Sequence, residues 1–262
     1  MSSGVVTDLK ILFFDIGNVL VSDDPSGVYC YKALHDALVA AGQSEDAADF
    51  FARRTEAFRE GCGLWGFVRR HTEFLPNQDF TAFQQRVRAE LYSRWSHFSP
   101  PIPGMAEAAQ KLASHYRLGI IANQPKEVLP LLEERGLLDL FEVHGVSAVL
   151  GLEKPDPRIF EWALEQAGVE PHEALMIGDR IDNDVRPAKQ LGLRTLWLKL
   201  GHEGRGWQPR NEFEHHYFRS NLEGCFSDLE PRSPEDEPDF IARTPEELVD
   251  LLTPSPEEAG AR

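Results

Sequence analysis

Acidic side chains in this 262-residue chain follow short apolar runs, a position where a carboxylate can do chemistry. Asp15 ends the run LKILFFD, and Gly17 and Asn18 come next in the turn DIGNV. A carboxylate at the end of an apolar segment costs desolvation energy unless a cation or hydrogen-bond donors receive it. Gly and Asn favour a tight turn with exposed backbone amides. The motif predicts a polar site at Asp15, and the alternative is a solvated aspartate or a helix cap.

A second acidic motif is IGDRIDND, which places Asp179, Asp182 and Asp184 within six residues of one another. Like charges this close repel unless a hard cation or a basic side chain neutralises them. Carboxylate oxygens of this kind are ligands that Mg²⁺ prefers. The alternative is a surface salt-bridge cluster with Arg180 and Arg186.

Two further polar residues occupy comparable positions. Lys154 lies in GLEKPDP, at the mouth of a loop, and Asn123 follows the apolar run LGIIA. A nucleophilic carboxylate, a polar loop for phosphate, a lysine that neutralises charge and a metal-binding acidic pair together form a phosphoryl-transfer site. Taken in order along the chain, the four segments predict such a site.

The segments that must position these residues alternate between strands and helices. Short apolar runs are typical of strands buried on both faces of a parallel sheet; they span residues 9–15, 118–122, 143–150, 174–177 and 195–200. Helical patterns lie between them, at 104–116, 126–135 and 158–167. For the last of these helices, the sequence predicts Asp156 as the N-cap and Pro157 as the first helical residue. The alternation predicts an α/β fold with a doubly wound, Rossmann-like parallel sheet, whose ligand site lies at the carboxyl ends of the strands.

Two long segments interrupt this alternation. Residues 28–98 contain amphipathic helical patterns at 28–41, 46–60, 64–74 and 80–95 and predict a small helical domain. Residues 201–238 are rich in Gly, Pro, Arg, His and acids, and we expect an irregular insertion outside the catalytic core. The expected division is an α/β core at 1–24 and 100–253, a helical domain at 25–99 and a disordered tail at 254–262.

Composition excludes several classes of partner. The chain has 27 Lys and Arg against 43 Asp and Glu, a formal net charge of −16. This balance argues against nucleic acid and against an anionic membrane surface, which both attract basic patches. Cys30, Cys62 and Cys225 form neither a disulfide framework nor a zinc pattern. The N-terminal residues lack a secretory pattern, so we expect a cytoplasmic protein, either monomeric or homodimeric.

The order of the motifs, with the stretches GDRIDND and EKPDP, resembles the haloacid dehalogenase superfamily of hydrolases. The likeness is to the branch with a helical cap inserted after the first strand, and it covers residues 9–24, 100–200 and the terminal PDFIARTPEELVDLL. It implies a Mg²⁺-dependent phosphatase that acts on a small phosphorylated metabolite through an aspartyl-phosphate. It also implies that residues 25–99 are the cap.

The resemblance assigns roles to individual residues. Asp15 matches the nucleophile, and Lys154 matches the lysine that neutralises nucleophile and phosphate. Asp179 matches the principal Mg²⁺ ligand, with support from Asp184 and from the carbonyl of Gly17. The phosphate-binding residues expected on this basis are Gly17, Asn18, Asn123 and Lys154.

Two positions depart from the family pattern. Gly17 stands where family phosphatases carry a second Asp as general acid, a role that Asp23 or Asp24 could take over. Ala122 replaces a phosphate-binding Ser or Thr, a loss of about 1.5–3 kcal/mol that Asn123 could partly offset. Gly17 keeps two alternatives open: a carbon–halogen hydrolase, whose leaving halide needs no acid, and a catalytically impaired binding protein. Family dehalogenases, however, usually lack the metal-binding acidic cluster that GDRIDND retains.

Overall fold

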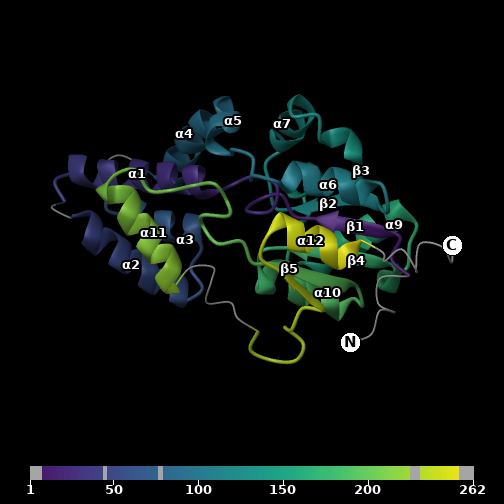
Figure 1. The fold of residues 1–262 in the computed structure, drawn as a ribbon. Coiled ribbons are helices and arrows are strands. Elements are labelled where there is room, and N and C mark those ends of the chain that lie inside the picture. Colours follow the sequence, from purple (N-terminus) through teal and green to yellow (C-terminus); the bar gives the residue numbers. More distant parts are fainter. Residues whose placement is uncertain (1–7, 44–45, 76–78, 225–230, 254–262) are drawn as a thin grey trace. The chain divides into compact units, whose positions relative to one another are not determined.

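The computed structural model describes residues 8–43, 46–75, 79–224 and 231–253 and divides the chain into two compact units (Figure 1). The α/β unit comprises Met1–Ser22, Pro101–Gly206 and Pro231–Arg262. The helical unit comprises Asp23–Pro100 and Trp207–Glu230. The chain therefore passes between the two units four times. The tail expected at 254–262 lies outside the described residues.

The α/β unit is built on a six-stranded sheet in the order β3-β2-β1-β4-β5-β6, and every paired neighbour is parallel. Its strands are β1 (Ile11–Phe14), β2 (Arg117–Ala122), β3 (Phe141–Val146), β4 (Ala174–Gly178), β5 (Arg194–Leu198) and β6 (Phe240–Ala242). This order is that of a Rossmann-like sheet. The doubly wound parallel sheet expected from the alternation of strands and helices is confirmed.

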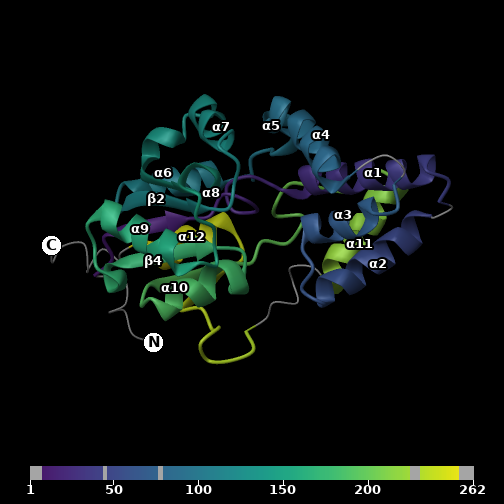
Figure 2. The ribbon, with the colours of Figure 1, turned by 180° about the vertical axis from the view of Figure 1, so that it is seen from behind.

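Helices cover both faces of the sheet, which is why its central strands are apolar throughout. Every residue of β1 and β4 is buried. Ile11 and Phe13 pack in one cluster with residues of α9 (Pro157–Ala167) and α10 (Arg186–Gln190), which lie on the near face in Figure 2. The remaining helices of this unit are α6 (Met105–Ala113), α7 (Val128–Glu134), α8 (Ser147–Leu150) and α12 (Pro245–Leu252).

Local signals set the ends of several elements. Asp156 caps α9 by accepting a hydrogen bond from the Arg158 N–H (3.0 Å), and Pro157 is the first helical residue, as expected. The run 143–150, by contrast, is not a strand throughout. β3 ends at Val146 and a helical turn, α8, follows up to Gly151, whose φ of 69° suits glycine. A short apolar run cannot distinguish these two conformations by periodicity.

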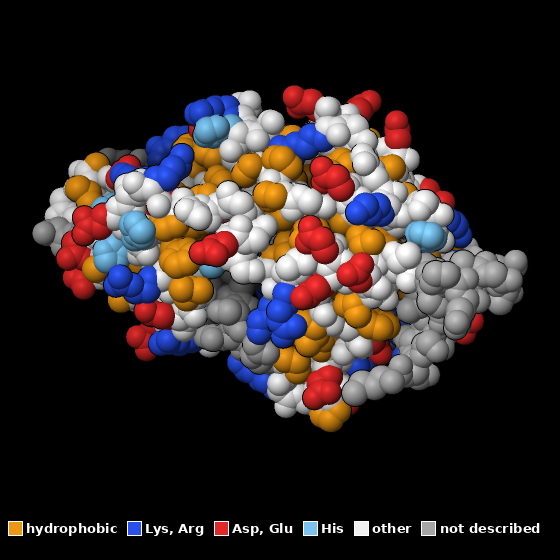
Figure 3. Space-filling model, viewed as in Figure 1, with side chains coloured by type: hydrophobic (Ala, Val, Ile, Leu, Met, Phe, Trp, Pro, Cys, Tyr) orange, Lys and Arg blue, Asp and Glu red, His pale blue; other side chains and the backbone are white. Residues whose placement is uncertain are grey.

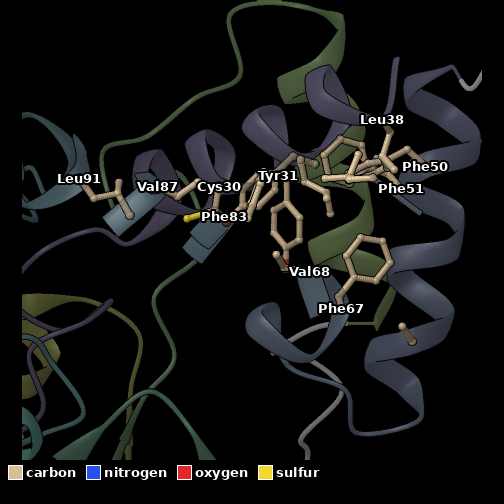
Figure 4. Close-up of a cluster of buried hydrophobic side chains, with 14 of the residues drawn as sticks. Cys30, Tyr31, Leu38, Phe50, Phe51, Phe67, Val68, Phe83, Val87 and Leu91 are labelled. Carbon is tan, nitrogen blue, oxygen red and sulfur yellow. The ribbon is translucent and has the colours of Figure 1, made fainter. Parts of the chain in front are cut away.

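The helical unit contains α1 (Asp24–Ala40), α2 (Ala47–Arg59), α3 (Leu64–Thr72), α4 (Phe80–Ser93) and α5 (Trp95–Phe98). Their apolar faces enclose one core, in which the rings of Tyr31, Phe50, Phe51 and Phe67 meet edge to face (Figure 4). Such aromatic pairs stabilise a core by about 0.5–1.5 kcal/mol each beyond the area they bury.

A further helix of this unit, α11 (Glu212–Gly224), comes from the segment expected to be irregular. The expectation for 201–238 is therefore wrong over 212–224. Phe213, Tyr217 and Phe218 lie at helical spacing and pack on the aromatic core of the unit. Charged residues on either side obscure this apolar stripe in the sequence. The surface of α2 on which it packs lies 165 residues earlier in the chain, counted from Thr55 to Ser220.

The end of the same segment returns to the α/β unit. Asp236 is buried and accepts two hydrogen bonds from the guanidinium of Arg186, at 2.5 and 3.0 Å. Lys189 also donates to the carbonyl of Glu237. Two neighbouring residues of α10 therefore fix residues 236–237, and the segment is anchored in one unit after contributing a helix to the other.

Arg54 of α2 joins α11 to the rest of the helical unit. Its side chain is almost completely buried, and it donates to Ser220 Oγ (2.6 Å) and Asn221 Oδ1 (2.7 Å). The guanidinium carbon also lies 4.5–5.0 Å from the centroids of the rings of Tyr31, Phe58 and Tyr217. Cation–π contacts of this kind gain strength when they are desolvated. Arg54 thus provides the polar centre of an otherwise apolar interface.

The surface carries charges of both signs. On the face shown in Figure 3, acidic and basic side chains are interspersed among apolar ones. No helix within the described parts of the chain has both the length and the hydropathy needed to span a bilayer.

Replacing Arg54 by Ala is expected to lower the free energy of unfolding by about 2–4 kcal/mol, because it leaves buried polar groups on α11 unpaired and removes the ring contacts. The matched control is Arg70→Ala in the same unit. Arg70 forms an exposed ion pair with Glu60, so its loss should cost less than about 1 kcal/mol. Urea unfolding followed by circular dichroism measures both, and equal effects of the two substitutions would contradict the structural role of Arg54.

Candidate functional site

The candidate site lies at the carboxyl ends of β1 and β4, the two central strands. They pair in register, with Phe14 opposite Ile177, and the Asp15 N–H donates to the Ile177 carbonyl (2.9 Å). The strand order reverses between these two strands, where open α/β sheets bind their ligands. Asp15 and Asp179, one residue beyond each strand, are therefore brought together by the sheet itself.

Asp15, Asp179 and Asp184 form one carboxylate cluster, with ligand oxygens within 4.8 Å of one another. Asp15 and Asp184 are buried and Asp179 is half-buried. Desolvation and the charges of Asp184 and Asp15 raise the pKa of Asp179 well above its usual range. Desolvation also raises the pKa of Asp184, to about 6, against the opposing effect of Lys154. The cluster therefore holds more negative charge than its surroundings stabilise.

Lys154 inserts its ammonium group into this cluster. Its Nζ lies 2.5 Å from Asp184 Oδ1 and 3.0 Å from Asp15 Oδ1, and the side chain is fully buried. Burial by itself lowers the pKa of Lys154, but Asp15 and Asp184 outweigh it and the net shift is upward. One lysine thus bridges two of the carboxylates and stays charged.

The turn after β4 places Asp184. Residues Ile181–Val185 form a π-helical turn, and Asp184 Oδ2 accepts a hydrogen bond from the Arg180 N–H (3.0 Å). A side chain at Gly178 would put its Cβ 2.3 Å from the Asp184 carboxylate. Glycine at position 178 is therefore required by the close approach of Asp184, and the stretch IGD carries this signal in the sequence.

Asp182 belongs to a different interaction. Its carboxylate pairs with the guanidinium of Arg180 through two hydrogen bonds, at 3.0 and 2.6 Å. It is not part of the carboxylate cluster. The salt-bridge alternative considered for this acidic motif thus holds for Asp182, whereas Asp179 and Asp184 join Asp15.

Asn18 takes the left-handed position of the turn after β1, with φ of 53°, where Asn is well tolerated. Its N–H donates to the Val21 carbonyl (2.6 Å), and Gly17 bridges to Val21. The side-chain amide donates weakly to Asp179 Oδ2 (3.4 Å). Asn18 therefore contacts the carboxylate cluster.

Asn123 contacts the backbone of Lys154. Its Nδ2 donates to the Lys154 carbonyl (2.7 Å), and its Oδ1 accepts from the Lys154 N–H (2.8 Å). Both polar atoms of the amide are engaged with one backbone residue. These two bonds use one of the two Nδ2 protons, so the expectation that Asn123 offsets the missing hydroxyl at the buried Ala122 stays a prediction.

A residue that sequence reasoning missed is Trp197 of β5. Its indole Nε1 donates to the Asp179 carbonyl (2.9 Å) and so holds the backbone of the cluster. A Trp in an apolar run is expected in a core, so the sequence carries no specific signal for this contact.

The two acids considered as substitutes for a general acid lie in the helical unit. Asp23 precedes α1, and its carbonyl accepts from Ser26 Oγ (2.9 Å). Asp24 is buried, and its Oδ1 accepts from the Tyr217 hydroxyl (3.3 Å) and from Asn221 Nδ2 (3.5 Å) of α11. The helix α11 therefore also orients Asp24.

The carboxylate cluster has the donor set of a hard-cation site. Carboxylate oxygens are the preferred ligands of Mg²⁺, and three of them converge here. Their raised pKa values indicate negative charge that an additional cation would stabilise. The residues present thus fit a divalent metal ion.

The raised pKa of Asp179 predicts how its removal affects stability. Without metal, the folded protein resists ionisation of Asp179, whereas the unfolded chain ionises it with an ordinary pKa of about 3.9. The free energy of unfolding therefore falls as the pH rises above that value. Asp179→Asn removes this pH-dependent loss. The metal-free variant should therefore be more stable than wild type by about 1 kcal/mol or more at about pH 8, and the gain should shrink at about pH 5.

Urea unfolding in the presence of a chelator measures this difference. Asp182→Asn is the control, since it removes a carboxylate outside the cluster and breaks the pair with Arg180. It should give no gain at either pH. If Asp179→Asn raised the stability equally at both pH values, the ionisation of Asp179 could not be the source of the gain.

Comparisons with known proteins identify relatives of this chain. The family model of haloacid dehalogenase-like hydrolases matches residues 9–192. A glyceraldehyde 3-phosphate phosphatase of Pyrococcus furiosus is 27% identical over 199 residues, which cover 74% of this chain and 82% of the relative. A pyrimidine 5'-nucleotidase of Escherichia coli is 35% identical over 137 residues, 49% of this chain and 61% of the relative.

A solved structure shows the same fold. The crystal structure of a phosphatase of this superfamily from Thermococcus onnurineus aligns with a TM-score of 0.61 and 25% identity, covering 94% of this chain and 99% of that one. The family match spans more than half of the chain and includes Asp15, Lys154, Asp179 and Asp184. The chain therefore belongs to the haloacid dehalogenase-like hydrolases.

Proposed function

We propose that this hydrolase is a Mg²⁺-dependent phosphatase that acts on a small phosphorylated metabolite. The observation that carries the proposal is the bridge from Lys154 Nζ to both Asp15 and Asp184, beside a carboxylate cluster that fits a divalent ion. This arrangement supplies a nucleophile and two kinds of positive charge for a phosphate dianion. The names of the relatives, a glyceraldehyde 3-phosphate phosphatase and a pyrimidine 5'-nucleotidase, support the reaction class.

In the proposed reaction, Asp15 attacks phosphorus in line with the ester oxygen. The P–O bond to the leaving alcohol breaks, and an aspartyl-phosphate forms that water then hydrolyses. The Ile16 N–H (2.8 Å) and Lys154 both bind Asp15 Oδ1, which leaves Oδ2 for the attack. The ammonium group of Lys154 neutralises negative charge on Asp15 and on the incoming phosphate. A bound Mg²⁺, held by Asp15, Asp179, Asp184 and the Gly17 carbonyl, would neutralise charge on the phosphate oxygens.

We assign the helical unit the role of the cap that excludes water and selects the substrate. Its core is closed by α11, so the cap comprises two separate chain segments, Asp23–Pro100 and Trp207–Glu230. The buried contacts of Arg54 and Asp24 with α11 support this assignment, because they make the later segment an integral part of the unit.

The alternative function is carbon–halogen hydrolysis, which Gly17 favours because a halide leaves without a proton. The carboxylate cluster argues against it, since such a reaction gains nothing from a divalent ion beside the nucleophile. Halide release from a 2-haloacid in the presence of a chelator, measured beside phosphate release from aryl phosphates with Mg²⁺, separates the two reactions.

The proposed nucleophile and metal ligand can be tested separately. Asp15→Asn should lower phosphatase turnover by about 10³-fold or more, because a covalent step is lost. Asp179→Asn should weaken Mg²⁺ binding in calorimetry while the fold persists. Asp182→Asn serves as the control for both measurements. Unchanged Mg²⁺ binding in Asp179→Asn would contradict the metal assignment, and full activity in Asp15→Asn would contradict the nucleophile.

Gly17 predicts a strong dependence on the leaving group. Without a general acid, alcohols leave poorly as alkoxides, so acyl and aryl phosphates should turn over faster than simple alkyl phosphates. A plot of log rate against leaving-group pKa should slope steeply for wild type and flatten in Gly17→Asp. The left-handed residue of this turn is Asn18, and Gly17 has no positive φ. The backbone at position 17 therefore does not require glycine, and Gly17→Asp can be used for this test. A flat wild-type line for rate-limiting chemistry would reveal an existing proton donor.

A further inference from the structure

Asn123 and Lys154 are 31 residues apart in the chain and are joined by a two-point contact. Asn123 follows β2, and Lys154 lies in the loop before α9. The amide of Asn123 both donates to the Lys154 carbonyl (2.7 Å) and accepts from the Lys154 N–H (2.8 Å). Two hydrogen bonds to the N–H and the carbonyl of one residue fix the orientation of its backbone as well as its distance.

We propose that Asn123 is a positioning residue for Lys154, and not a ligand of the substrate phosphate. The inference rests on the proposed function, in which Lys154 Nζ must reach Asp15 and Asp184 at once. In this proposal the side-chain amide of Asn123, which follows β2, binds the backbone of the loop that carries Lys154.

The geometry of Lys154 explains why such a restraint matters. A lysine side chain has four rotatable bonds, and its Nζ has to satisfy contacts of 2.5 and 3.0 Å to two different carboxylates. The loop around it begins at the turn at Gly151 and ends at the cap of α9 at Asp156, and the Asn123 contact lies between these two points. A backbone shift of about 1 Å in a catalytic site can cost about 100-fold in rate.

Asn123 itself contributes little to the core. Its side chain is exposed, whereas Lys154 is buried, so truncating it creates no cavity. A large effect of Asn123→Ala on rate would therefore not follow from lost packing. Because Asn123 contacts Lys154 without being part of the core, its substitution tests the contact and not the packing.

The test is a double-mutant cycle with p-nitrophenyl phosphate and Mg²⁺. Asn123→Ala should lower kcat by about 10- to 100-fold. In the Lys154→Ala background, the same change should alter the rate by less than about twofold, because residues that act through one another are not additive. A phosphate ligand would instead lower the rate by the same factor in both backgrounds and weaken inhibition by inorganic phosphate. Either that result or an unchanged kcat in Asn123→Ala would overturn the proposal.

Asp156→Ala is the matched control for loop stability. It removes the cap of α9 in the same loop but leaves the Asn123 contact in place. Its loss should destabilise the protein by about 1 kcal/mol. If loop destabilisation explained the effect of Asn123→Ala, Asp156→Ala would slow the reaction to the same degree, and the proposal would fail.

A crystallographic comparison makes the result independent of turnover. In wild type, Lys154 Nζ should contact both Asp15 and Asp184, and in Asn123→Ala it should leave Asp15. An unmoved Lys154 in the variant would overturn the positioning role even if activity fell. A wild-type protein that hydrolyses no aryl phosphate would instead refute the proposed phosphatase, and the crystal structures would still decide whether Asn123 holds Lys154.

Discussion

Carboxylates at Asp15, Asp179 and Asp184 approach one another within 4.8 Å, and they cannot all be ionised unless positive charge lies among them. The α/β unit is organised around this constraint. Lys154 supplies one charge, from a fully buried position between two of the carboxylates. The raised pKa values of Asp179 and Asp184 show that one lysine does not complete the compensation. A divalent cation bound among these carboxylates would complete the compensation, as the proposed function requires.

The surrounding residues hold this charged cluster by hydrogen bonds to its backbone and to one of its carboxylates. Trp197 donates to the carbonyl of Asp179, Asn123 binds the carbonyl and the N–H of Lys154, and the Arg180 N–H donates to the carboxylate of Asp184. Preorganised dipoles of this kind cost no reorganisation during reaction, which is why they are effective in catalysis. Each restraint comes from a different strand end, so the parallel sheet acts as the common frame.

The helical unit uses a second buried charge for a structural purpose. Arg54 lies among aromatic rings and binds Ser220 and Asn221 of α11. The same helix donates to Asp24 through Tyr217 and Asn221. α11 lies beyond residues 9–192, the part matched by the family model. The helical unit of this chain thus includes a segment that follows β5, and a polar network ties that segment to α1 and α2.

The sequence by itself determined the features that depend on local pattern. Continuous apolar runs predict strands buried on both faces, and their alternation with helices predicts the parallel sheet, because these signals lie within a few residues. Asp15 and Asp179 were recognisable because each directly follows such a run, and parallel strands end at one edge. The spacing of the acids alone does not distinguish Asp182 from Asp184. The family resemblance selects Asp184, and the tertiary structure gives the physical reason, since the π-helical turn directs Asp182 toward Arg180 and Asp184 toward Lys154. Tertiary structure alone decided the partner of Asn123 and the place of α11, because hydrogen-bond partners and packing surfaces distant in sequence leave no periodic signal in the chain.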